Sequence, residues 1–175
     1  MTAESITPII NKLLLGVAVL AFLAMIDTAW LTYMHYAPEV GEFCTINDQL
    51  DCQKVNSSPW SMLNLGFVVL PVAGIAFVYY TILMVGAIGI IKKWKFQKIH
   101  KILRQGVVLQ WLRYFGYLGL IFTLYLTYIE AFKLQTFCIF CVIQQILIIG
   151  IVALFLRANK YVKDQKEEGE VCEFC

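Results

Sequence analysis

The chemistry in this sequence is concentrated in its six cysteines, Cys44, Cys52, Cys138, Cys141, Cys172 and Cys175. Residues three apart lie on one face of a helix, so the sulfurs of a Cys-x-x-Cys can close into a disulfide. A helix N-terminus carries partial positive charge, which lowers the pKa of a thiol there and favours the reactive thiolate. The spacing of Cys138 and Cys141 at the start of an apolar run therefore predicts thiol–disulfide chemistry.

Two amides lie close to this pair in the helical pattern. Gln144 and Gln145 follow Cys141 by three and four residues, one turn further along the same face. They could donate hydrogen bonds to a quinone carbonyl just inside a membrane. Asp27, an acid within the first apolar stretch, is either functional or a helix-end residue that reaches water.

Four apolar stretches must position these residues, at about Ile9 to Tyr33, Met62 to Ile91, Val107 to Tyr128 and Phe137 to Leu156. Each is long enough to span a bilayer, which takes roughly 20 residues. Hydrophobic residues make up 60% of the chain and charged residues 15%, with a mean hydropathy of +0.73, so a soluble domain is excluded. The sequence predicts an all-α integral membrane four-helix bundle with a capping loop between the first two helices.

Two of these stretches need a further comment. The first is longer than a signal-peptide core, so we expect it to be retained as a spanning helix. The second is long enough to predict a tilt, an interfacial end, or a kink at Pro71 or Gly74.

Charge placement predicts which loops face the cytoplasm. Residues 92–106 carry six lysines and arginines and no acid, whereas residues 35–60 carry four acids and one lysine. Short cytoplasmic loops are enriched in Lys and Arg. We therefore expect a multi-pass protein of the cell (inner) membrane with both termini cytoplasmic. The first loop and the short turn that holds Glu130 and Lys133 then face the periplasm or exterior. The basic loop is explained by topology, so no nucleic-acid partner is expected.

This orientation gathers four cysteines, Cys44, Cys52, Cys138 and Cys141, on the oxidising side, where disulfides persist. Two inert disulfides would be the structural alternative, and four thiolates around zinc a further one. Exposure to oxidation argues against zinc, so no metal is expected. We assign residues 1–160 to a four-helix transmembrane redox domain and residues 161–175 to a charged cytosolic tail. For the Cys172 and Cys175 pair in this tail, metal binding shared with another chain and no role both remain open.

The loop sequence also resembles a known family. It reads Phe43-Cys44-Thr45-Ile46, then Leu50-Asp51-Cys52-Gln53-Lys54-Val55-Asn56-Ser57-Ser58-Pro59-Trp60. With Cys138-Ile-Phe-Cys141 at the fourth helix and Asp27-Thr28-Ala29-Trp30-Leu31-Thr32-Tyr33 at the end of the first, it resembles the vitamin K epoxide reductase family, in its bacterial and archaeal branch. The resemblance covers about residues 19–156.

The resemblance implies an electron route. Cys44 exchanges with a partner dithiol, Cys52 passes electrons to Cys138, and Cys141 faces a quinone, ubiquinone or menaquinone. The candidate quinone contacts are Ser58, Trp60, Asn64, Gln144 and Gln145. The chain ends after the fourth helix, so the partner is expected to be a separate thioredoxin-fold protein on the outer side.

The expected activity is that of an enzyme, a quinone-dependent oxidoreductase that supports disulfide-bond formation. Three alternatives remain open. The first is a vitamin K epoxide reductase in the strict sense, although Gln145 stands where animal members have a tyrosine. The others are a tetraspan soft-metal-ion transporter and a disulfide-stapled membrane scaffold.

Overall fold

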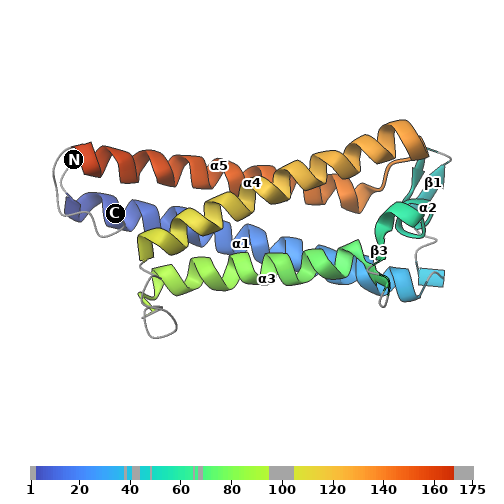
Figure 1. Ribbon diagram of the computed structural model, residues 1–175, viewed down its shortest axis with the longest axis horizontal. Helices are drawn as coiled ribbons and strands as arrows, with labels where there is room; N and C mark the ends of the chain where they lie inside the picture. The colour runs from blue at the N-terminus through green and yellow to red at the C-terminus, as the bar shows by residue number, and fades with distance from the viewer. Residues whose placement is uncertain are drawn as a thin grey trace.

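Four long helices form the body of the molecule (Figure 1). The computed structural model describes residues 3–37, 39–40, 44–47, 49–64, 66, 69–94 and 105–167, so Cys172, Cys175 and most of the basic loop lie outside the described residues. The four helices are α1 (Ala3–Tyr36), α3 (Val72–Ile91), α4 (Gln105–Ile129) and α5 (Ile139–Glu167). Each overlaps a segment that is long and apolar enough to cross a bilayer: Pro8–Tyr36, Val72–Ile91, Gly106–Leu134 and Ile139–Lys163. The predicted all-α membrane bundle is confirmed.

The helices pack as a ring in which α1 contacts α3 and α5, and α4 contacts the same two helices. Small buried side chains on α1, among them Ala18, Ala21 and Ala24, let its neighbours approach closely. Large apolar side chains such as Leu15, Ile121 and Ile146 point outward. An outer surface of this kind suits lipid rather than water.

The second apolar stretch is not a single helix. Its first residues form an antiparallel hairpin of β3 (Met62–Asn64) and β4 (Val69–Pro71), and α3 starts only at Val72. Pro71 therefore lies before the helix, so a kink at Pro71 within it, one of the three expected alternatives, is wrong. Pro71 has φ −66° and ψ 134° and directly precedes the helix. A proline is tolerated at a helix start because no intrahelical N–H bond is needed there.

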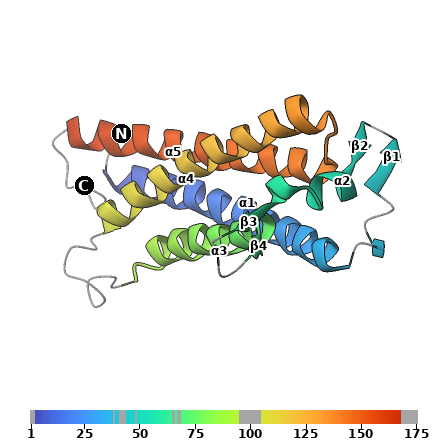
Figure 2. The same ribbon diagram turned by 45° about the vertical axis from the view of Figure 1, so that its right-hand side comes forward.

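A cap covers one end of the bundle, opposite to the start of α1 and the end of α5 (Figure 2). It contains β1 (Thr45–Asn47), β2 (Leu50–Asp51), α2 (Cys52–Asn56) and the short helix η2 (Pro59–Ser61). The Asp51 carboxylate caps α2 by accepting the backbone N–H of Lys54. This cap is the predicted loop between the first two spanning helices.

Hydrogen bonds anchor the cap to α1. The Asn56 side chain donates to the Leu31 carbonyl at 3.0 Å, and the His35 ring lies 2.9 Å from the Asn56 carbonyl. Since Asn56 is buried, these bonds hold the end of α2 against the helix bundle.

The chain passes from α4 to α5 through a wide turn. The segment η4 (Glu130–Leu134) is π-helical, and Gln135 closes it in the left-handed region with φ 50°. The Gln135 N–H donates to the Glu130 carbonyl, and so does the N–H of Thr136 at 3.2 Å. Turns of π-helix are rare in proteins, and those that occur are often found at functional sites.

Candidate active site

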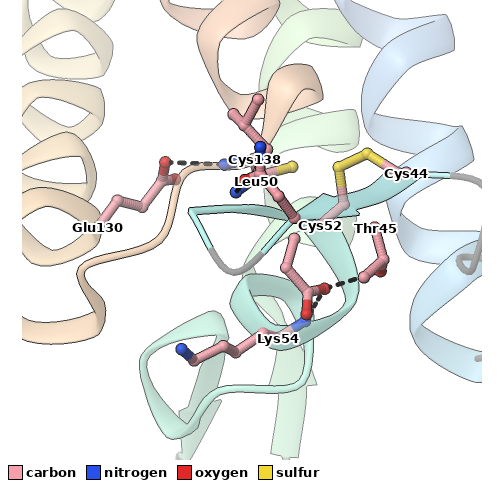
Figure 3. The surroundings of a disulfide bond; sticks show 9 residues. Cys44, Thr45, Leu50, Cys52, Lys54, Glu130 and Cys138 are labelled. Atoms are coloured by element: carbon pink, nitrogen blue, oxygen red, sulfur yellow. Dashed lines mark hydrogen bonds between the residues drawn. A yellow bond between two sulfur atoms is a disulfide. The ribbon is translucent and has the colours of Figure 1, made fainter.

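Four cysteines meet beneath the cap. Cys44, Cys52 and Cys138 lie in one buried cluster, and Cys141 packs against it. Cys44 and Cys52 form a disulfide with their Cα atoms 5.5 Å apart, whereas Cys138 and Cys141 are free thiols. Figure 3 shows the Cys138 sulfur on the side that faces the disulfide. The two pairs therefore sit close together in different redox states.

The main chain aligns the two pairs. Leu50 in β2 and Phe137 before α5 form a parallel β-bridge. The Asp51 N–H donates to the Phe137 carbonyl at 3.1 Å, and the Phe137 N–H donates to the Gln49 carbonyl at 2.8 Å. Cys138 directly follows Phe137, and Cys52 directly follows Asp51, whose N–H is bonded to Phe137, so these main-chain bonds bring Cys52 and Cys138 close together.

A side-chain contact adds to this link. The Lys54 ammonium of α2 donates to the Thr136 hydroxyl at 3.0 Å. Thr136 is fully buried, so the contact ties the cap to the turn between α4 and α5.

The two thiols of the Cys-x-x-Cys are not equivalent. Cys138 directly precedes α5, and its carbonyl accepts the first helical bond, from the Val142 N–H at 3.1 Å. This is the N-cap position. A hydrogen bond from the Cys141 thiol, supported by the backbone N–H groups of Cys141 and Phe140, lowers the pKa of Cys138 below its ordinary value despite burial. The pKa of Cys138 is thus lowered chiefly by the Cys141 thiol, and the N–H groups of the helix start add to this effect.

A cavity of about 460 Å³ lies next to these thiols. Four of the five predicted quinone contacts, Ser58, Trp60, Gln144 and Gln145, line it together with Cys141. Asn64 is not among its lining residues. Its side chain accepts the Gly66 N–H at 2.8 Å, and the neighbouring Leu63 lines the cavity instead. Successive side chains of a strand point to opposite faces, which explains why Leu63 rather than Asn64 lines the cavity.

The cavity has polar atoms without a hydrogen-bond partner. Among the described residues, the buried Gln144 Oε1 and Gln145 Nε2 have none. Tyr80 bonds the Gln144 side chain, and the Thr127 hydroxyl donates to Gln145 Oε1 at 3.4 Å. One acceptor and one donor are thus left over in a mainly apolar cavity. Such atoms cost about 1–3 kcal/mol each when unpaired, so a ring with oxygen substituents fits the site.

One site residue was not predicted from the sequence. Glu130, expected only in an outer turn, is 4% exposed and lines the same cavity. Its Oε2 accepts the Cys138 N–H at 3.4 Å (Figure 3). The Cys141 thiol has one proton, which it can donate either to this carboxyl or to the Cys138 sulfur. The available signal was an acid at the end of an apolar run, eight residues before Cys138.

Asp27 is not among the residues that line this cavity. It lines a separate hollow of about 450 Å³ between α1 and α5, whose other walls are apolar. Its Oδ2 is buried and has no hydrogen-bond partner among the residues the structure describes.

A disulfide, two adjacent thiols and a cavity within a membrane bundle allow electron pairs to move by thiol–disulfide exchange. An arrangement of this kind suits a membrane redox enzyme. The family model described as the vitamin K epoxide reductase family matches residues 15–156, and the chain belongs to this family. A search of curated proteins finds none that matches.

Proposed function

We propose that this protein oxidises the dithiol of a thioredoxin-fold protein and passes the electrons through both cysteine pairs to a quinone, in support of disulfide-bond formation. The observation that carries the proposal is the joint position of the cysteines: the disulfide and both thiols lie in one cluster at the edge of the cavity. Thiol–disulfide exchange requires that the sulfurs can reach one another, and the packing of all four cysteines in one cluster supports this.

The proposed route starts at the cap. A thiolate of the partner attacks Cys44, forms a mixed disulfide and releases Cys52 as the leaving thiol. Cys52 then attacks Cys138 in the oxidised form of the inner pair and releases Cys141. The second thiol of the partner attacks the mixed disulfide, which forms the partner's own disulfide and releases Cys44. Cys44 then attacks Cys52, re-forms the cap disulfide and releases Cys138. In the structure Cys44 and Cys52 form a disulfide, whereas Cys138 and Cys141 are thiols. The pair that would reduce the quinone is therefore the one beside the cavity.

A quinone suits the cavity because the left-over polar atoms match its oxygens. Gln145 Nε2 would donate to a carbonyl, and Gln144 Oε1 would accept from a hydroxyl. Ser58 and Trp60 would complete the wall on the cap side. The quinone, ubiquinone or menaquinone, supplies the capacity to take two electrons and two protons.

The protein is further proposed to have a defined orientation in the cell membrane. We place both termini in the cytoplasm and the cysteines on the periplasmic or outer face of the cell membrane. The start of α1 and the end of α5 lie opposite to the cap, as this orientation requires. The partner is proposed to be a separate protein, and the chain to belong to the bacterial and archaeal branch.

Quinone reduction by the purified protein in detergent, with a dithiol as electron donor, tests the proposal. The intact chain should reduce a ubiquinone or menaquinone analogue, and Cys141→Ser should not. Cys172→Ser makes the same chemical change in the tail and should leave turnover unchanged. No turnover with either analogue, in protein whose cap disulfide is formed, would contradict the proposal.

A further inference from the structure

Glu130 brings a carboxyl group into direct contact with the reactive thiols. The side chain is 4% exposed and comes from the π-helical turn at the end of α4. Its Oε2 accepts the Cys138 N–H at 3.4 Å, and the carboxyl can accept a hydrogen bond from the Cys141 thiol. The same carboxyl lines the cavity, as Cys141 does. Glu130 therefore touches both the thiol that is to be oxidised and the space in which its electrons are to be accepted.

The charged and titratable side chains around the Glu130 carboxyl indicate that the two thiols are the groups with which it can exchange a proton. Among the described residues, the nearby charged or titratable side chains are Cys138 and Cys141 at α5, Tyr79 and Tyr80 of α3 across the cavity, Lys54 of α2, and Lys133 of the same turn. The Lys54 ammonium donates to the Thr136 hydroxyl, and Lys133 is exposed. Tyr79 donates to the Phe115 carbonyl, and Tyr80 bonds Gln144.

A structural role alone would not require an acid. An amide oxygen could accept the Cys138 N–H as well as a carboxylate does, without the cost of burying a charge. What a carboxyl adds at this position is the ability to take up and release a proton. A group within hydrogen-bond reach of the proton that it removes meets the geometric condition for a general base.

We propose that Glu130 is a catalytic residue that accepts the proton of the Cys141 thiol and returns it on the cavity side. This inference rests on the proposed function. The S–H bond of Cys141 breaks and an O–H bond forms on Glu130. Oxidation of the two thiols to the Cys138–Cys141 disulfide releases two electrons and two protons. A quinone takes up both electrons and both protons, of which one passes through Glu130 and the other comes from the Cys138 thiol.

The first test needs no quinone. In a Cys138→Ser background Cys141 is the remaining thiol of the site, and its alkylation by iodoacetamide can be followed by mass spectrometry between about pH 5 and pH 10. With Glu130 present, thiolate forms by proton transfer to the carboxylate. The alkylation rate should therefore rise with pH in two steps. Between the steps we expect a plateau in which Glu130 and Cys141 share one proton. Glu130→Gln cannot take the proton, so a single step is expected.

Glu130→Asp keeps the carboxyl on a shorter side chain and should retain both steps. This variant also serves if Glu130→Gln does not form the cap disulfide and is judged unfolded. A single step with Glu130 or with aspartate present, or two steps in Glu130→Gln, would overturn the proposal.

The second test is quinone turnover in the chain with all its cysteines. Glu130→Gln should lower kcat about a hundredfold with little change in KM, as expected for loss of a general base. Glu39→Gln removes an exposed acid in the first loop and should change neither constant. An unchanged kcat in Glu130→Gln would overturn the role of Glu130 and leave the proposed function standing. A two-step alkylation profile in a chain that reduces no quinone would support the proton acceptor and contradict the proposed function.

Discussion

Cys138 and Cys141 are only three residues apart, yet their surroundings give them different chemistry. Cys138 holds the N-cap position of α5, where backbone N–H groups stabilise a thiolate. Cys141 lies one turn into the helix, lines the cavity and contacts Glu130. A Cys-x-x-Cys at a helix start thus separates the two sulfurs into one that suits exchange with another disulfide and one that lines the cavity.

Cys141→Ala should raise the pKa of Cys138, because the Cys141 thiol makes the largest contribution to lowering it. A lowered pKa means that the Cys138 thiolate is present at a lower pH than in an ordinary thiol. Without the donor, the midpoint of Cys138 alkylation should therefore move to higher pH. Alkylation rates across pH, measured on the Cys138 peptide by mass spectrometry, would give the shift.

Cys141→Ser is the matched control for this prediction. Its hydroxyl can still donate to the Cys138 sulfur, so the midpoint should stay closer to that of the intact chain. If alanine and serine give the same midpoint as the intact chain, the hydrogen bond does not set the acidity of Cys138.

Sequence reasoning at the residue scale depended on local periodicity. Gln144 and Gln145 were predicted as quinone contacts because helical spacing relates them to Cys141, and both line the cavity. Asn64 was assigned to a helix, whereas it lies in a strand, and its side chain accepts a hydrogen bond from the Gly66 N–H in the hairpin turn. Glu130 was missed because the π-helical turn that brings it inward has no sequence pattern that distinguishes it from an exposed loop.

At the scale of elements, the hairpin before α3 shows why apolar content is not sufficient. Residues 62–91 form one apolar stretch, yet the first part is strand and only the second part is helix. Short apolar runs do not distinguish strand from buried helix. Gly66, with φ 85°, lies in the hairpin turn, and Pro71 marks the helix start. These two residues were the usable signals.

The bridge between β2 and Phe137 predicts which sulfurs can meet. In the double variant Cys44→Ser/Cys141→Ser, the remaining Cys52 and Cys138 should form a disulfide in high yield, because the main chain holds them together. Mass spectrometry of the unreduced protein would detect it. The matched variant Cys52→Ser/Cys138→Ser leaves Cys44 and Cys141, which should form little disulfide. Equal yields in the two variants would contradict the electron route from Cys52 to Cys138.

The contact between α3 and α4 depends on a glycine. A Cβ atom at Gly119 would overlap the Tyr79 ring, which stacks on Phe115 with centroids 5.3 Å apart and donates to the Phe115 carbonyl. Gly119→Ala should therefore destabilise the bundle by about 1–3 kcal/mol, as measured by thermal unfolding in detergent.

Gly74→Ala is the control for this substitution. Its nearest neighbour would be Pro71 Cγ at 3.5 Å, an ordinary contact, so the change should be neutral or stabilise α3 by up to about 1 kcal/mol. An equal loss of stability in both variants would show that steric overlap at Tyr79 is not the cause.

For the whole molecule, hydropathy and helix length were enough to predict the bundle. Four spans were expected, and the part of the chain that the structure describes contains four helices of sufficient length and apolarity. The ring order of the helices could not be predicted in this way. It depends on where small side chains such as Ala21, Ala87 and Gly86 permit close approach, and such residues also occur at lipid-facing positions.

The proposed orientation predicts the accessibility of engineered cysteines. In intact cells, a membrane-impermeant maleimide should label Gln49→Cys, an exposed residue of the cap, and should not label Lys93→Cys after α3. Lys93→Cys should react only after the membrane is permeabilised. The reverse pattern would place the cap, and with it the cysteines, in the cytoplasm.

The π-helical turn at Glu130–Leu134 also limits how this chain can vary in length. A π-helix holds one more residue per hydrogen-bonded turn than an α-helix, so this segment corresponds to a single-residue insertion at the end of α4. Deleting one residue here would restore regular winding and rotate the chain beyond the deletion by about 100°. Glu130 and Cys138 would then leave their shared position, even though neither had been substituted. In functional homologues, the number of residues between these two positions should therefore vary less than the types of the residues in between.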